Sequence, residues 1–514
     1  MTSTTIRVVG AGAMGRGIAQ LAVAAGIDVE LADARVDAVH EAVAFITRML
    51  HRSAEKGAMT EHAAQQAISR LHVCAGPTEP SNRVDIAIEA VVERLDVKQS
   101  LLSALEESTP QALLASNTSS LSITAIASAL KDPSRLIGLH FFNPVPLMRL
   151  VEVVPGLQST PGAVDTGIDL VRRLGHHAIV ARDTPGFIVN HVGRALPTEA
   201  LAILSEGIAS PDDIDRIARD TLGLKMGPFE LMDLTGLDVS HTVMEKIAAG
   251  FYWDPRLRPS PIAATRVAGK WFGRKTQHGF YRYDEGRQIQ CDEQKIIPDP
   301  AARPLYVHAN PDLRGILNAS GVHVVDTPSA EATSVVLPVG VPTHEAALDA
   351  GLDPADTIGI DPLSLGGPRW TVIIPIVLDR LRGSAALQSL SAAGRSITVT
   401  GDGPAPIAQR LVAAIVNLGA ALAEHGIGHP DDIDSGARLG LGYPQGPLAM
   451  GDDYGTSMIV DVLDHMNERT RDPRYRASEW LRARATLTQS LLTVGTRPED
   501  LSAGHLRIHT RKEH

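Results

Sequence analysis

The sequence has few cysteines, few aromatic residues and no excess of basic residues. Its two cysteines, Cys74 and Cys291, lie far apart in a chain of 514 residues, which excludes a disulfide framework or a CxxC metal pair and favours a reducing cytoplasm. Aromatic residues make up 4% of the chain, and 59 acidic residues outnumber 48 basic ones, for a net charge of −11. Because such a chain repels polyanions, nucleic acids and anionic membrane surfaces are disfavoured as partners.

Long hydrophobic runs and a targeting segment are also missing. Residues 1–5 are short and polar, without the basic-then-apolar pattern of a signal peptide. Apolar windows such as residues 372–378 fall far short of the roughly 20 residues of a membrane helix. The basic tail, residues 505–514, is expected to fray. We therefore expect a cytoplasmic protein without a membrane partner, and its length predicts several domains.

The chain opens with a strand, a glycine-rich turn and a helix. A β-branched run at residues 6–9 leads into Gly10, helical spacing follows over residues 14–25, and a second strand at residues 29–32 completes a βαβ unit. Further strands are expected at residues 86–89, 113–116, 137–140 and 150–154. This alternation predicts a doubly wound parallel α/β domain over residues 1–184.

The rest of the chain alternates between purely helical segments and a segment that mixes strands with helices. Helical patterns at residues 187–206 and 211–221 predict an all-α domain over residues 185–284. Short β-branched runs then predict a reduced α/β unit over residues 285–400, with strands at residues 305–308, 322–325, 335–337 and 372–376. Residues 401–514 return to helical patterns up to the end of the chain.

The two helical regions are copies of one another. Between residues 210 and 233, 12 of 24 positions recur without a gap at an offset of 219, beginning with Pro211-Asp212-Asp213-Ile214-Asp215, which returns as Pro430-Asp431-Asp432-Ile433-Asp434. This repeat indicates that a two-domain unit, an α/β unit followed by a helical domain, is duplicated in the chain.

A glycine motif marks a dinucleotide site. Residues 10–15, Gly-Ala-Gly-Ala-Met-Gly, follow a strand and open a helix, so Gly10 permits the tight turn, Gly12 lets the backbone approach a pyrophosphate, and Gly15 allows close helix–sheet packing. Ala13 and Met14 complete the motif. Asp33 ends the second strand, where a carboxylate accepts hydrogen bonds from a ribose and repels a 2′-phosphate. The motif therefore favours NAD over NADP in a Rossmann domain, although Asp33 also suits a plain turn.

Polar residues gather after later strands of the same domain. The run at residues 116–121, Ser-Asn-Thr-Ser-Ser-Leu, follows a strand, where open α/β sheets bind ligands, although Ser122 or a neighbour also suits a helix cap. His140 ends one strand and Glu152 lies in the next, so the two can meet as a base and its orienting carboxylate, whereas a lone histidine is more often structural. Asn190, in the first turn of an apolar helix, faces either the α/β domain or a helix interface.

Together these motifs resemble the L-3-hydroxyacyl-CoA dehydrogenases, in the long bacterial form with a reduced Rossmann-like unit and a second helical domain. That form includes the 3-hydroxybutyryl-CoA and 3-hydroxyadipyl-CoA dehydrogenases of phenylacetate breakdown. The resemblance rests on GAGAMG, EAVVE, SNTSSL, GLHFFNPVPLMRLVE, DTPGFIVN and GPFELMD, which span residues 6 to about 283. It implies NAD-dependent oxidation of a (3S)-3-hydroxyacyl-CoA to the 3-oxoacyl-CoA.

The resemblance also assigns roles to individual residues. It implies that His140 is the general base, that Glu152 orients it, and that Ser119 and Asn190 hold the substrate oxygens. It places four further residues on the nicotinamide-ribose side of the cofactor: Glu93, Lys98, Asn117 and Asn143. Lys56 is a weaker candidate for the CoA phosphates, since a surface lysine is usually a solvated charge. No metal site is expected.

The second half departs from this pattern. A provisional alignment at an offset of 221 puts Gly340 opposite Ser119, Asp361 opposite His140 and Ile373 opposite Glu152. The helical repeat puts Gln409 opposite Asn190, and Ala309-Asn310-Pro311 stands where a glycine loop would be. We therefore expect no second active site. The duplicated helical domain is expected to pack on the first as an internal pseudo-dimer, without excluding a homodimer.

Two other functions compete with the main interpretation. A dehydrogenase of a different 3-hydroxy acid or a sugar would be expected to carry a lysine near the DTPGFIVN segment, and residues 173–223 contain none. A catalytically idle NAD-binding relative is disfavoured by the intact catalytic set. Acyl length is not legible from sequence, but a dicarboxylyl substrate would need a cation at the far end of the pocket, for which Arg149 and Arg194 are candidates.

Overall fold

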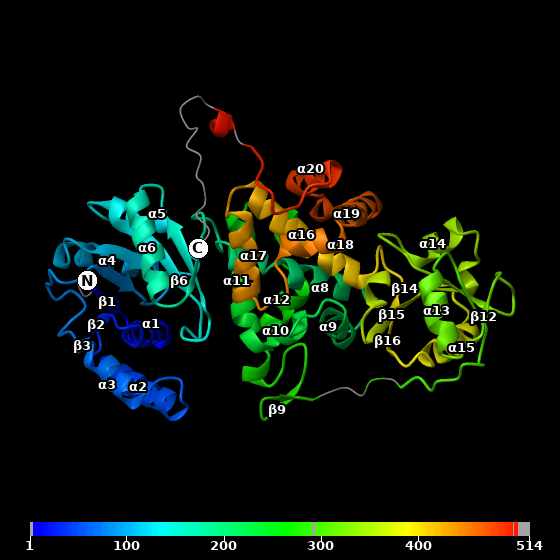
Figure 1. Ribbon diagram of the computed structural model, residues 1–514, viewed down its shortest axis with the longest axis horizontal. Coiled ribbons are helices and arrows are strands. Elements are labelled where there is room, and N and C mark those ends of the chain that lie inside the picture. The colour runs from blue at the N-terminus through cyan, green and yellow to red at the C-terminus, as the bar shows by residue number, and fades with distance from the viewer. Residues whose placement is uncertain (1–3, 290–292, 294, 497, 502–514) are drawn as a thin grey trace.

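The computed structural model describes residues 4–289, 293, 295–496 and 498–501. Cys291 and the basic tail at residues 505–514 lie outside the described residues. The molecule has three lobes in a row (Figure 1). The N-terminal α/β domain forms one end, the second α/β unit forms the other, and both helical regions lie between them.

The N-terminal domain is built on an eight-stranded sheet in the order β3-β2-β1-β4-β5-β6-β7-β8. Its strands are β1 (Thr5–Val9), β2 (Asp28–Ala32), β3 (Leu71–Val73), β4 (Ile86–Glu89), β5 (Leu113–Ser116), β6 (Leu136–Phe141), β7 (Leu150–Pro155) and β8 (His177–Val180). The α-helices are α1 (Ala13–Ala24), α2 (Val36–Glu55), α3 (Glu61–Ser69), α4 (Leu95–Ser108), α5 (Ile123–Ala127) and α6 (Pro161–Arg173). The predicted doubly wound α/β class is confirmed.

The two edge strands of this sheet, β3 and β8, were not predicted from the sequence. Both are short and largely exposed or half-buried, so neither carries the continuous apolar run that marks a strand buried on both faces. All neighbouring strands pair in parallel except β6 and β7. The connection between β6 and β7 is too short for a crossover helix, so the chain must turn back antiparallel.

The first helical region contains α7 (Val189–Val192), α8 (Ala195–Glu206), α9 (Pro211–Asp220), α10 (Pro228–Thr235), α11 (Leu237–Gly250) and α12 (Pro261–Ala268). The single helix expected at residues 187–206 is wrong: it starts at Val189 and is interrupted at Gly193 and Arg194. A Cβ at Gly193 would lie 3.0 Å from a side-chain methyl of Leu441, so the second helical region packs closely against this break.

The second α/β unit has a narrower, six-stranded sheet in the order β12-β11-β13-β14-β15-β16. Its strands are β11 (Leu305–Val307), β12 (Val324–Val325), β13 (Thr333–Val336), β14 (Thr357–Ile360), β15 (Arg369–Ile374) and β16 (Ser396–Gly401), of which β14 and β16 were not predicted. Its helices are α13 (Pro311–Ala319), α14 (Thr343–Asp349) and α15 (Arg380–Ser391), and a small hairpin of β9 (Tyr283–Asp284) and β10 (Arg287–Gln288) precedes it.

The second helical region contains α16 (Ile407–Glu424), α17 (Pro430–Gly440), α18 (Pro447–Tyr454), α19 (Thr456–Thr470) and α20 (Glu479–Leu487). The expectation of helix to the end of the chain is wrong over residues 488–496, which form turns and irregular backbone. By length and composition α16 could cross a membrane, but 89% of it is buried inside the protein, as in a core helix.

The repeated sequence motif encodes a repeated helix cap. Asp215 accepts hydrogen bonds from Phe229 N and Glu230 N, both at 2.9 Å, at the start of α10. Asp434 does the same for Leu448 N and Ala449 N at the start of α18, at 2.8 and 2.9 Å. Each carboxylate satisfies two of the N–H groups that a helix leaves unpaired at its first turn. In each copy the helix is preceded by a glycine, because a Cβ at that position would collide with the aspartate.

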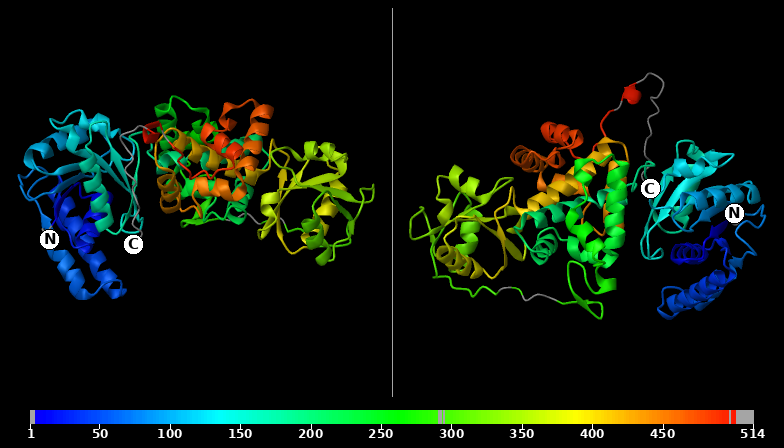
Figure 2. Two further views of the ribbon diagram at one scale, coloured as in Figure 1. Left: turned by 45° about the horizontal axis from the view of Figure 1, so that its top comes forward. Right: turned by 180° about the vertical axis from the view of Figure 1, so that it is seen from behind.

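The two helical regions pack side by side in the centre of the molecule, as both views from other directions also show (Figure 2). Helices α8 and α16 cross there, and the buried Arg410 of α16 donates to Glu199 Oε1 of α8 at 2.8 Å and to both carboxylate oxygens of Glu206. Tyr475 Oη also donates to Glu199 Oε1, at 3.2 Å. One apolar core therefore includes residues of both helical regions.

Candidate active site

The glycine loop between β1 and α1 is shaped to hold a dinucleotide. Gly10 has a φ of +109°, and a Cβ there would lie 2.5 Å from Ala90 O, so only glycine fits. A Cβ at Gly12 would meet nothing within 4 Å, which leaves the backbone open toward a cavity of about 1050 Å³. That cavity is lined by the loop residues Gly10, Gly12, Ala13 and Met14, by Asp33, and by residues of α4. The observed cradle therefore fits a dinucleotide at a helix N-terminus.

Asp33 has two functions at this cavity. Its Oδ2 accepts a hydrogen bond from Ala11 N at 2.8 Å, and its Oδ1 accepts one from Arg35 N at 2.9 Å. The carboxylate therefore fixes the glycine loop from below while keeping lone pairs on the cavity side for ribose hydroxyls. The sequence analysis left a ribose contact and a turn residue as alternatives, and the geometry allows one side chain to serve as both.

A single carboxylate, Glu93, organises the loop that carries Ser119. Glu93 Oε1 accepts hydrogen bonds from Thr118 Oγ1 at 2.6 Å, and from Ser119 N and Ser120 N at 3.0 Å each. Burial by itself would raise the pKa of Glu93, but these donors and the charge of Lys98 hold it below its ordinary value. The ionised Glu93 thus holds the loop in a shape that leaves the Ser119 side chain exposed.

The other three predicted cofactor residues occupy different positions. Lys98 is buried, with Nζ 2.6 Å from Glu89 Oε1 and 3.3 Å from Glu93 Oε2, so it lies beneath the site rather than on its surface. Asn117 Oδ1 accepts a hydrogen bond from Phe141 N at 2.9 Å and thereby ties the end of β5 to the end of β6. Asn143 is exposed in the connection after β6. Contacts of these residues with the cofactor remain predictions.

His140 and Glu152 face each other across β6 and β7. The antiparallel register pairs the two residues, and His140 Nδ1 lies 2.6 Å from Glu152 Oε2, with both side chains buried. Phe142 and Phe187 pack against the imidazole, with ring centroids at 4.4 and 5.8 Å. A carboxylate at Nδ1 holds the proton there and leaves Nε2 as the basic nitrogen.

Glu152 also connects this pair to the helical region. Its Oε1 accepts hydrogen bonds from Ile188 N and Val189 N, both at 2.9 Å, at the start of α7. Asn190 is the next residue, half-buried, and its side-chain amide makes no hydrogen bond within the part of the chain that is described. One carboxylate therefore orients the imidazole and positions the helix turn that carries Asn190, a connection that no local sequence pattern indicates.

Lys56 lies at the edge of a separate groove of about 480 Å³ between α1, α2 and the connection after β6. Arg16 and Arg52 line the same groove, and the Arg16 guanidinium stacks over Phe45 with its carbon 4.0 Å from the ring centre. Asn143 is also part of the lining. The sequence analysis missed the two arginines, because they become neighbours of Lys56 only when α1 packs against α2.

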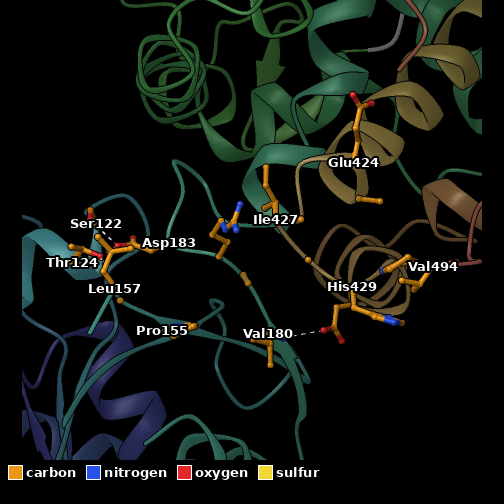
Figure 3. A pocket seen from close by; sticks show the side chains of 18 of the residues that line it. Ser122, Thr124, Pro155, Leu157, Val180, Asp183, Glu424, Ile427, His429 and Val494 are labelled. Atoms are coloured by element: carbon orange, nitrogen blue, oxygen red, sulfur yellow. Dashed lines mark hydrogen bonds between the residues drawn. The ribbon is translucent and has the colours of Figure 1, made fainter. Parts of the chain in front are cut away.

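Another cavity, of about 1220 Å³, contains none of the predicted catalytic residues. It lies between the N-terminal domain and the second helical region, with Asp183, Ser122 and Thr124 on one side and Glu424 and His429 on the other (Figure 3). Asp183 is engaged in capping α5, accepting from Ser122 Oγ, Ile123 N and Thr124 N. Among the described residues, no group of three or more His, Cys, Asp or Glu side chains could hold a metal ion.

The second α/β unit keeps the layout of the site without its chemistry. Gln409, the counterpart of Asn190, accepts a hydrogen bond from Gly340 N at 2.9 Å and donates to Asp361 Oδ1 at 3.1 Å. The counterparts of Ser119, His140 and Asn190 therefore meet, but the glutamine is hydrogen-bonded to both of the others. Burial raises the pKa of Asp361 to about 6.

The expected match between Ile373 and Glu152 is wrong. Gly359 pairs with Ile373 and Ile360 with Val372, so the same antiparallel register brings Thr371 opposite Asp361, and Asp361 N donates to Thr371 O at 3.0 Å. His140 and its partner Glu152 are 12 positions apart, whereas Asp361 and the residue opposite it, Thr371, are only 10 apart, so the turn between the paired residues is two residues shorter here. An ungapped offset therefore fails once it crosses that turn.

Comparisons with known proteins identify relatives of this chain. Residues 5–184 match the family model of the 3-hydroxyacyl-CoA dehydrogenase NAD-binding domain, and residues 186–283 and 407–490 both match that of the C-terminal domain. The chain is 33% identical over 94% of its length to the 3-hydroxyadipyl-CoA dehydrogenase of Escherichia coli strain K12, covering 98% of that protein. It is 38% identical to a probable 3-hydroxybutyryl-CoA dehydrogenase of Bacillus subtilis, over 54% of this chain and 97% of the relative.

Solved structures support the same conclusion. The crystal structure of an Escherichia coli 3-hydroxybutyryl-CoA dehydrogenase matches with a TM-score of 0.83 and 32% identity, covering 95% of this chain and 99% of that one. That of the (S)-3-hydroxybutyryl-CoA dehydrogenase of Ralstonia eutropha matches with a TM-score of 0.53 and 36% identity, covering 55% and 100%. The resemblance inferred from sequence is confirmed. The protein belongs to the 3-hydroxyacyl-CoA dehydrogenase family and is an NAD-dependent oxidoreductase.

Proposed function

We propose that the site at the carboxyl ends of β5 and β6 oxidises (3S)-3-hydroxyacyl-CoA thioesters with short or dicarboxylyl acyl chains. The observation that carries this proposal is the buried His140–Glu152 pair, 2.6 Å apart, at the strand ends beside the dinucleotide cavity. Names of relatives support the substrate range, since they include 3-hydroxyadipyl-CoA and 3-hydroxybutyryl-CoA dehydrogenases. The exposed Ser119 and the unengaged Asn190 amide disfavour an idle relative, because both keep hydrogen-bonding capacity for a ligand.

His140 would remove the proton of the 3-hydroxyl group through Nε2. NAD, when bound in the cradle of the glycine loop, accepts the hydride from the same carbon. Glu152 stabilises the imidazolium that forms and keeps its Nδ1 protonated, so the pair can return the proton in the reverse direction. Ser119 and Asn190 would hold the substrate oxygens, and the packed rings of Phe142 and Phe187 shield the imidazole from water.

The groove at Lys56 is proposed to hold the CoA phosphates. Arg16, Arg52 and Lys56 together place three positive charges along it, which offsets the repulsion that a net charge of −11 exerts on a polyanionic ligand. The groove shares Asn143 and the following connection with the catalytic side of the domain. A CoA thioester could therefore reach from the groove to His140.

The second half is proposed to serve as an internal partner. Its helix α16 buries the face of α8, and an antiparallel bridge between Ala181 and Gly428 joins it to the N-terminal domain. We expect the full chain to be a monomer in the cytoplasm. Light scattering tests this, since a stable dimer at micromolar concentration would show that the internal partner does not replace an external one.

The proposed reaction is tested by NADH formation with a panel of (S)-3-hydroxyacyl-CoAs, including the hydroxybutyryl and hydroxyadipyl thioesters. Turnover is expected with NAD and should be much weaker with NADP, because the Asp33 carboxylate repels a 2′-phosphate. NAD binding without turnover of any thioester would contradict the proposal and favour the idle relative or a different 3-hydroxy acid.

A further inference from the structure

Arg194, between α7 and α8, is a half-buried arginine without a carboxylate partner. The more deeply buried arginines are all paired: Arg7 with Glu30, Arg369 with Asp220, and Arg410 with Glu199. No acidic side chain among the described residues forms an ion pair with Arg194. Burial lowers the pKa of Arg194 to about 10, and Tyr443 is the ionisable group that acts on it. Even a partly buried guanidinium without a counter-charge costs the folded protein stability.

The guanidinium lies beside the catalytic turn. Arg194 follows Asn190 by one helical turn, and its Nε donates to Asn190 O at 3.0 Å, so its side chain folds back over that turn. A longer contact of 3.5 Å reaches Ser240 O at the start of α11. Both acceptors are neutral carbonyl groups, which leaves the positive charge without a neutralising partner.

Part of Arg194 remains open to solvent. The residue is half-buried, although neighbouring residues on both sides, Gly193 and Ala195, are fully buried. Tyr443, from the second helical region, is the aromatic neighbour, and its hydroxyl makes no hydrogen bond within the described part of the chain. The other sequence candidate, Arg149, is exposed in the connection between β6 and β7 and can exchange freely with water.

We propose that Arg194 binds the terminal carboxylate of a dicarboxylyl-CoA substrate and makes the enzyme selective for it. The inference rests on the proposed function, because it assumes that the 3-hydroxyl lies at His140 and that Asn190 contacts the substrate. In a six-carbon dicarboxylyl chain the second carboxylate is three carbons beyond the reacting carbon, and the proposal places it on the side of the Asn190 turn. A planar guanidinium binds such a carboxylate through two parallel hydrogen bonds.

The test compares (S)-3-hydroxyadipyl-CoA with (S)-3-hydroxyhexanoyl-CoA, which have equal chain length but end in a carboxylate and a methyl group. The measured quantity is the ratio of their kcat/KM values. The wild-type enzyme should favour the adipyl substrate, and Arg194→Met should lower this preference by about 10- to 100-fold, the effect of losing hydrogen bonds to a charged group. Arg149→Met is the matched control and should leave the ratio unchanged, while Arg194→Lys should restore part of it.

A second measurement needs no variant. Adipyl-CoA and hexanoyl-CoA lack the hydroxyl group, and each is tested as a competitive inhibitor of the wild-type enzyme. Adipyl-CoA is expected to bind about 10-fold tighter or better. Equal inhibition, or an equal loss on both substrates in Arg194→Met, would overturn the assignment. Failure of every 3-hydroxyacyl-CoA to react with NAD would instead refute the proposed function, and the inhibition comparison would still test Arg194.

Discussion

Replacing Glu152 by glutamine tests the catalytic pair most directly. The wild-type carboxylate uses one oxygen for His140 Nδ1 and the other for Ile188 N and Val189 N. A glutamine amide has one acceptor and one donor end, so it can satisfy only one of these sides. If its oxygen faced the imidazole, two buried N–H groups would be left unpaired, at about 1–3 kcal/mol each. The amide group is therefore expected to keep its oxygen on the helix and point its NH₂ at His140.

That orientation reverses the histidine tautomer. Nδ1 must then accept a hydrogen bond, so the proton moves to Nε2 and the basic nitrogen is lost. A fall in kcat of about 10³- to 10⁴-fold is expected, comparable to the loss from the same tautomer change in a serine protease triad. Because the helix contacts are kept, the unfolding temperature and NAD binding should change little.

The assay is steady-state NADH formation, with NAD affinity and thermal unfolding measured in parallel. Glu106→Gln is the matched control, because Glu106 is a buried carboxylate of the same domain that accepts from Lys131 N and Asp132 N at 2.9 and 2.7 Å without facing a histidine. Its kcat should stay within a few-fold of the wild type. A folded Glu152→Gln variant with more than a tenth of wild-type activity would refute the tautomer argument.

Three further perturbations have expected outcomes. Burial, with Arg256 nearby, lowers the pKa of His191 to about 3. Because the histidine stays neutral in the folded protein, the free energy of unfolding should fall as the pH drops below about 6.5, by about 2 kcal/mol at pH 5. Urea unfolding should show that this pH dependence is weakened in His191→Phe but retained in a variant of the exposed His72. Arg410→Met removes the nearest cation from the buried Glu199, which keeps only Tyr475 Oη at 3.2 Å and Arg474 at 3.6 Å, and should cost about 3 kcal/mol of unfolding free energy; a loss below 1 kcal/mol would contradict the packing of α8 on α16. Arg16→Ala should raise KM for CoA thioesters several-fold but not for the same acyl group on pantetheine, and an equal rise for both would place the phosphates elsewhere.

Local patterns account for most of the fold. The strand, glycine turn and helix at the N-terminus could be predicted because the motif requires only neighbouring residues, and the structure gives each glycine the close contact or open face that it needs. The helical repeat could be recognised because Asp215 and Asp434 perform the same cap within one short segment each. The pairing of His140 with Glu152 could be predicted because a short connection forces adjacent strands to run antiparallel.

Other features depend on contacts between distant segments. The break after α7 is associated with Leu441, more than two hundred residues away, packing on Gly193. The edge strands β3 and β8 are too short and exposed to carry a signal of their own. The register that pairs Thr371 with Asp361 depends on the length of a turn, which shifts every later residue to a different partner.

By itself, therefore, the sequence determined the family, the cofactor class and the pairing of His140 with Glu152, because these depend on residue types at short, fixed spacings. Only the tertiary structure decided that Glu152 supports the turn carrying Asn190, that Arg16 and Arg52 join Lys56, and that Arg194 is half-buried against Asn190 while Arg149 is exposed. The physical reason is that hydrogen bonding, burial and the absence of a counter-charge are properties of the packed neighbourhood, and that neighbourhood is assembled from segments far apart in the chain.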